Sequence, residues 1–107
     1  MSEYLPRQYQ AFREQYPEVC AAFDRLGSAC HEAGPLDEHT RRLIKLGIAT
    51  ALQSEGAVKS HARQALQAGA AADEVRHAVL LALTTGGFPG VVAAMGWVDE
   101  VLQARGG

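Results

Sequence analysis

Apolar residues recur at intervals of three and four along most of this 107-residue chain, the spacing of amphipathic α-helices. Prolines and glycines divide the pattern into segments, and no segment shows the strict alternation of a half-buried strand. The pattern predicts helices at residues 4–15, 17–33, 37–53, 54–69, 73–83 and 89–105. The connections are short, so neighbouring helices should pack antiparallel. We expect an all-α fold of about six helices in one domain that spans residues 1–107.

The second to sixth helices all carry apolar faces, and those of the second, third and fifth are the most informative. In the second helix the face consists of Val19, Ala22, Phe23, Leu26, Ala29 and Cys30. In the third, which Asp37 is expected to cap, it consists of Leu36, Thr40, Leu43, Ile44, Gly47, Ile48 and Ala51. The fifth is apolar almost all round after its first two turns, which predicts that it is the central helix.

Composition narrows the classes of function. The net charge of −2 gives no electrostatic footprint for nucleic acid or an anionic membrane, and no apolar run approaches the roughly 20 residues of a membrane span. The N-terminus has no apolar core typical of a signal peptide, so the cytoplasm is the expected compartment. Alanine dominates the apolar residues and buries little area per residue, which favours association into oligomers.

Two cysteines, Cys20 and Cys30, fall ten residues apart on the second predicted helix. A helical rise of about 15 Å would separate them, which is too far for a disulfide. We expect both to be small buried or half-buried hydrophobes.

His61 is the candidate functional side chain, because it adds one titratable group to a helix face of small apolar residues. Two interpretations are open. It is either a histidine at the edge of the core that joins two helices through one nitrogen, or a general acid/base with a pKa near neutrality. The other three histidines form no ligand-spaced cluster with His61, so we expect no metal site.

Several segments together are similar to the carboxymuconolactone decarboxylase family. Residues 36–44, Leu-Asp-Glu-His-Thr-Arg-Arg-Leu-Ile, resemble the segment that opens the family pattern. Residues 61–70 resemble its segment in which a histidine precedes an Ala-Leu pair and a Gly-Ala turn, and Asp73–Val75 and Gly86–Pro89 resemble later family segments. The resemblance implies the all-helical fold of alkylhydroperoxidase D and a homo-oligomer, commonly a trimer or hexamer.

The family has two chemical branches. The alkylhydroperoxidase branch uses a Cys-x-x-Cys pair four residues before the histidine, together with an upstream glutamate. Aligned on His61, the two cysteine positions fall on Ser54 and Ala57, and the glutamate position falls on Arg42. Peroxide reduction by that route needs a thiolate, so peroxidase or disulfide reductase activity is not expected. The chain resembles the decarboxylase branch more, although its residues just before His61 differ from that branch.

The first functional hypothesis is therefore a cofactor-free, decarboxylase-like enzyme that acts on a small carboxylated lactone or keto acid. His61 would be the general acid/base and Glu55 a second catalytic carboxylate, while Ser54 and Arg42 would contact the substrate. Apart from His61, each of these residues also has a structural interpretation: Glu55 as a first-turn residue, Ser54 as an N-cap, and Arg42 as a solvated charge. The second hypothesis is a non-catalytic oligomeric binding protein that keeps the fold.

Overall fold

The computed structural model describes residues 7–105, and all regular secondary structure in that range is helical. Within these residues the chain forms α1 (Arg7–Gln15), α2 (Pro17–Glu32), α3 (Glu38–Ala51), α4 (Glu55–Gln67), α5 (Ala72–Leu80), α6 (Leu83–Gly86) and α7 (Phe88–Ala104). The predicted all-α class is confirmed. The start predicted for the first helix at residue 4 lies outside the described residues. The chain divides into two compact units, one up to Pro35 and one from Leu36 onward, which are described separately.

The first unit contains α1 and α2. Arg13 on α1 donates one hydrogen bond of 2.9 Å to the Tyr9 hydroxyl and one of 2.7 Å to Asp24 on α2. Pro17 begins α2, as predicted, because its fixed φ suits the first helical position. Cys20 is buried as expected, whereas Cys30 is exposed, which corrects its predicted burial.

The apolar face predicted to bury α2 is largely uncovered within the first unit. Val19, Phe23 and Leu26 have exposed fractions of 57%, 69% and 60%. Among the described residues of this unit, only Cys20 belongs to the buried class. Helix α1 therefore does not bury this face of α2.

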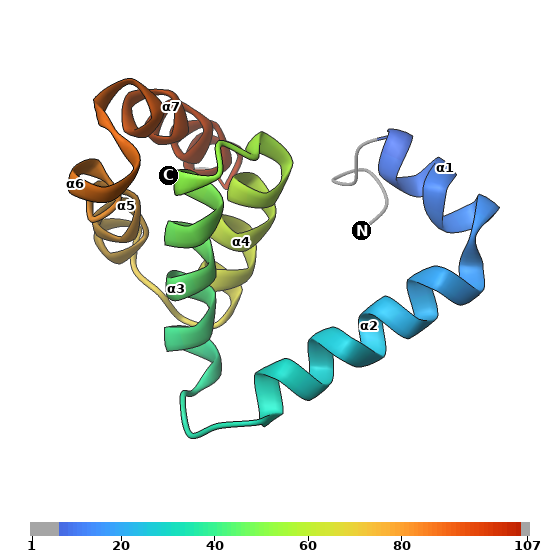
Figure 1. The fold of residues 1–107 in the computed structure, drawn as a ribbon. Coiled ribbons are helices and arrows are strands. Elements are labelled where there is room, and N and C mark those ends of the chain that lie inside the picture. The colour runs from blue at the N-terminus through green and yellow to red at the C-terminus, as the bar shows by residue number, and fades with distance from the viewer. Residues whose placement is uncertain (1–6, 106–107) are drawn as a thin grey trace. The chain divides into compact units, whose positions relative to one another are not determined.

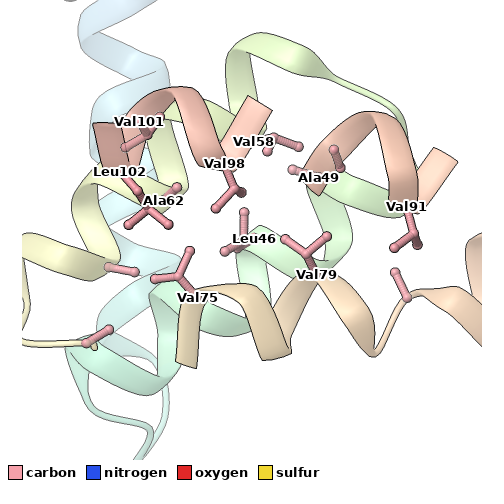
Figure 2. Close-up of a cluster of buried hydrophobic side chains, with 14 residues drawn as sticks. Leu46, Ala49, Val58, Ala62, Val75, Val79, Val91, Val98, Val101 and Leu102 are labelled. Atoms are coloured by element: carbon pink, nitrogen blue, oxygen red, sulfur yellow. The ribbon is translucent and has the colours of Figure 1, made fainter. Parts of the chain in front are cut away.

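In the second unit, α3, α4, α5 and α7 surround one hydrophobic core (Figure 1). Figure 2 shows Leu46 of α3 meeting Val58 of α4, Val79 of α5 and Val98 of α7. All four side chains are fully buried. Most other members of the core are alanine or valine, so the helices approach closely and each contact buries little area.

The face of α3 that enters this core is not the predicted one. Leu46, Ala49 and Thr50 are buried, and the Thr50 hydroxyl donates a 2.9 Å hydrogen bond to the Leu46 carbonyl. Ile44 and Ile48, which were assigned to the interior, are 46% and 54% exposed. Helix α3 is apolar on two sides, and periodicity alone cannot choose which side meets the neighbouring helices.

The fifth helix is also not central. It ends at Leu80 instead of residue 83, and Leu81 is 64% exposed. A one-turn helix, α6, follows in the region predicted as a break, and Gly87 then turns the chain with a φ of 97° into α7. Among the described helices α7 contributes the most buried residues to the core, namely Val91, Ala94, Val98, Val101 and Leu102.

Candidate functional site

His61 lies at the edge of the buried side of α4. Its neighbours Val58, Ala62 and Ala65 are fully buried, while the His61 side chain is half-buried and its Nδ1 atom is shielded from solvent. The small apolar setting expected from the sequence is therefore present. The imidazole therefore has one nitrogen shielded from water while part of the ring stays exposed.

Arg42 lies on the helix that packs against α4. Helices α3 and α4 run side by side, and only residues 52–54 connect them (Figure 1). Arg42 lies eleven residues before Gln53 in the connection, and Gln64 lies eleven residues after it. If the two helices run antiparallel, Arg42 is therefore level with Gln64, which is about one helical turn past His61 along α4. The Arg42 guanidinium donates a 2.7 Å hydrogen bond to Glu38, and this bond, more than that from Arg41, lowers the pKa of the Glu38 carboxyl.

Glu55 occupies the first turn of α4, where its carboxylate lies 2.9 Å from the ammonium of Lys59. Lys59 also donates a 2.8 Å hydrogen bond to Glu100 of α7, and these two carboxylates, Glu100 first, raise the pKa of Lys59. Lys59, through Glu55 and Glu100, therefore links the start of α4 to α7. Six residues of helix, about 9 Å of rise, separate Glu55 from His61.

Ser54 holds the N-cap position of α4, with extended backbone angles (φ −96°, ψ 98°). Its carbonyl accepts the first hydrogen bond of the helix, 2.8 Å from the Val58 amide, but its exposed side chain makes no capping bond. Ser54 therefore occupies the predicted N-cap position, but its side chain does not form the hydrogen bond of a capping residue.

A groove of about 500 Å³ lies between α3 and α5, beside α6, and contains none of the four predicted site residues. We call it the α3–α5 groove. Its lining is mostly apolar, with Glu74, His77 and Thr85 as polar members; the full lining is Leu43, Ile44, Gly47, Ile48, Ala51, Glu74, His77, Ala78, Leu81, Ala82 and Thr85. The helix face that was predicted to enter the core forms one wall of it.

The polar residues of this groove, Glu74 and His77, were not predicted from the sequence. The Glu74 carboxylate accepts a 2.8 Å hydrogen bond from the Ala71 amide and lies 3.1 Å from Nε2 of His39 on α3. The backbone bond, followed by the histidine, lowers the pKa of Glu74. The signal that could have found it is the Glu-x-x-His spacing of Glu74 and His77, which puts both on one helix face.

The described residues, 7–105, contain no group of three or more His, Cys, Asp or Glu side chains arranged to hold a metal ion. They also contain no helix that is both long enough and apolar enough to cross a membrane.

Residues 17–100 match the sequence profile of the carboxymuconolactone decarboxylase family. The chain belongs to this family. The resemblance that rested on residues 36–44 and 61–70 is therefore confirmed. Family membership does not by itself assign a reaction to His61.

The chain is also similar to three known proteins. An uncharacterized protein of Haemophilus influenzae is 33% identical over 64 residues, which are 60% of this chain and 57% of that protein. The apo crystal structure of a carboxymuconolactone decarboxylase family protein from Legionella pneumophila has a TM-score of 0.78 and 27% identity, with 90% of this chain and 86% of that one covered. A crystal structure from Thermotoga maritima has a TM-score of 0.72 and 26% identity, with 90% of each chain covered.

Proposed function

We propose that this carboxymuconolactone decarboxylase family member is a cofactor-free, decarboxylase-like enzyme that acts on a small carboxylated lactone or keto acid. His61 is its general acid/base. The observation that supports the proposal most is the half-buried imidazole of His61, with Nδ1 shielded from solvent, on a face of small side chains. A histidine that borders the core in this way is a side chain suited to the role of general acid/base.

The chemistry needs no metal or organic cofactor when the carboxylate leaves from a carbon next to a carbonyl group. The bond between that carbon and the carboxylate breaks, carbon dioxide departs, and the electron pair moves into the carbonyl as an enolate. Protonated His61 then donates its proton to the carbon and recovers one from water. The guanidinium of Arg42, about one turn away on the neighbouring helix, orients the substrate carboxylate.

Glu55 and Ser54 have supporting roles in this proposal. Because about 9 Å of helix separates Glu55 from His61, a proton relay between them runs through water or through the substrate. The Ser54 hydroxyl, which makes no capping bond, contacts the substrate from the same end of α4. The family resemblance further supports a homo-oligomer, a trimer or a hexamer, as the working form.

The test is release of carbon dioxide from a set of lactone and β-keto acids by the wild-type protein and by His61→Gln. We expect the variant to lose at least about 100-fold in turnover, the usual contribution of a positioned acid/base. His77→Gln is the matched control and should keep wild-type turnover. Undiminished activity in His61→Gln removes His61 from the mechanism, and no release from any acid by the wild type removes the reaction class.

A second candidate function is a non-catalytic oligomeric binding protein. The observation that favours it is the α3–α5 groove, whose lining contains none of the residues proposed for catalysis. In titrations with the same acids followed by NMR, binding in this groove shifts the His77 ring resonances. Binding at the proposed catalytic site shifts those of His61 instead.

A further inference from the structure

Gln64 follows His61 by three residues on α4, so the two side chains are neighbours on the surface of the helix. The Gln64 amide nitrogen donates a 3.2 Å hydrogen bond to the hydroxyl of Ser60, four residues earlier. Ser60 and His61 are thus the two side chains beside which a residue at position 64 lies along the preceding turn. Because the nitrogen of the amide is directed to Ser60, its oxygen is left for His61.

The amide oxygen of Gln64 is shielded from solvent and accepts no hydrogen bond from the described residues, 7–105. Buried acceptors in folded proteins are nearly always paired, because an unpaired one gives up its bonds to water without a replacement. Nδ1 of His61 is shielded from solvent as well. Water is therefore screened from both atoms, and a hydrogen bond between them would not have to compete with it.

We propose that Gln64 is the positioning residue of His61, and that its amide oxygen accepts a hydrogen bond from Nδ1–H. The partner of one ring nitrogen sets which tautomer a histidine adopts. With the proton held on Nδ1, the other nitrogen, Nε2, exchanges protons with the substrate. Hydrogen bonds around a catalytic group are often long before the substrate binds and tighten in the complex. The catalytic meaning of this bond rests on the function proposed for His61, whereas the bond itself does not require turnover.

The bond fits the proton transfer proposed for this site. In the cationic form of His61 both ring nitrogens carry a proton. Release of the Nε2 proton to the substrate carbon leaves the neutral Nδ1–H tautomer, which the Gln64 oxygen stabilises. The proton recovered from water then returns to Nε2. Gln64 therefore keeps the same nitrogen of the ring in use through the whole cycle.

The test is the tautomer of neutral His61 in the full chain, read from long-range proton–nitrogen NMR spectra at about pH 9, where an ordinary imidazole is neutral. We expect the Nδ1–H tautomer in the wild type. Gln64→Met has a side chain of similar length without the amide oxygen, so the ratio of Nδ1–H to Nε2–H should fall by at least about fivefold, the effect of one neutral hydrogen bond. Gln64→Glu keeps an acceptor and should restore the wild-type ratio.

Gln67→Met is the matched control, because it makes the same change at an exposed position of the same helix. It should keep the wild-type ratio, and circular dichroism should show unchanged helix content in all three variants. A wild type with its proton on Nε2 overturns the proposal, because the amide would then donate to Nδ1 instead of accepting from it. An unchanged ratio in Gln64→Met, or an equal change in Gln67→Met, overturns it too.

Turnover separates a failure of this inference from a failure of the proposed function. If His61 is the general acid/base, kcat of Gln64→Met falls in proportion to the Nδ1–H population, while KM stays nearly the same. An unchanged kcat in a variant whose tautomer has changed contradicts the positioning role. A wild type that releases carbon dioxide from no acid removes the proposed reaction, and the tautomer spectra still decide whether Gln64 holds the His61 ring.

Discussion

Gln53 donates a hydrogen bond of 2.9 Å from Nε2 to the carbonyl of Gly90, 37 residues further along the chain. The same nitrogen donates a 2.8 Å bond to the Thr50 carbonyl. Gln53 therefore ties the turn that leads into α4 to the first turn of α7. Only a glycine leaves room for this contact, because a β-carbon at position 90 would lie 2.7 Å from Nε2. The start of the helix that carries His61 is held in this way.

Replacing Gln53 should separate two opposing effects. Gln53→Ala removes both side-chain hydrogen bonds and should lower the free energy of unfolding by about 1–2 kcal/mol. Gln53 has a left-handed φ of 57°, so Gln53→Gly loses the same bonds but relieves about 1 kcal/mol of backbone strain. Urea unfolding of both variants measures the difference. A glycine variant less stable than the alanine variant would contradict the argument.

Asp37 and Ser54 both precede a helix, but only Asp37 caps it through its side chain. The Asp37 carboxylate accepts a 2.8 Å hydrogen bond from the Thr40 amide, and this bond is the main cause of its lowered pKa. Asp37→Ala should therefore lower the thermal midpoint by about 4 °C, the typical effect of losing a cap in a small domain. Ser54→Ala should leave the midpoint unchanged. Equal losses in the two variants would show that Ser54 also caps α4.

Glu74 should make stability depend on acid pH. Its pKa lies below the ordinary value of 4.5, because the Ala71 amide and then His39 favour the charged carboxylate in the folded state. A depressed folded pKa contributes stability that is fully present above about pH 4.5 and is lost as pH falls through the folded value. Wild-type protein should lose more stability between pH 6 and pH 3 than Glu74→Gln does, as measured by urea unfolding.

The control for this pH dependence is Asp73→Asn, one residue earlier on α5. The Asp73 carboxylate reaches only as close as 4.0 Å to the Arg76 guanidinium. This variant should follow the wild-type pH profile. A profile for Glu74→Gln that coincides with the wild type would mean that the contacts of Glu74 with Ala71 and His39 do not persist in solution.

Much of the fold could be predicted because its signals are local. Pro17 at the start of α2, Asp37 before α3 and Pro89 in the first turn of α7 act on the residues beside them, and the helix boundaries near them agree with the structure. The failures lie where the signal was ambiguous. Residues 81–83 were predicted to continue the fifth helix, whereas the helix ends at Leu80 and the chain forms α6 (Leu83–Gly86) before Gly87.

The candidate site could be predicted in part. The small apolar setting of His61 follows from its neighbours on α4, which are known from spacing alone. The Glu55–Lys59 pair is also a local, four-residue contact, but its extension to Glu100 spans 41 residues and needed the packing of α4 on α7. The contact between His39 and Glu74 spans 35 residues and became visible only when α3 met α5.

The sequence by itself determined the helical class, the family and the position of its one candidate histidine on α4. Each of these follows from residue type and short-range spacing, which the folded neighbours do not alter. Only the tertiary structure decided which of the two apolar sides of α3 is buried. The core took Leu46 and Ala49 and left Ile44 and Ile48 in an open groove. Periodicity shows that a face is apolar, but the helices that pack against it decide whether it is covered.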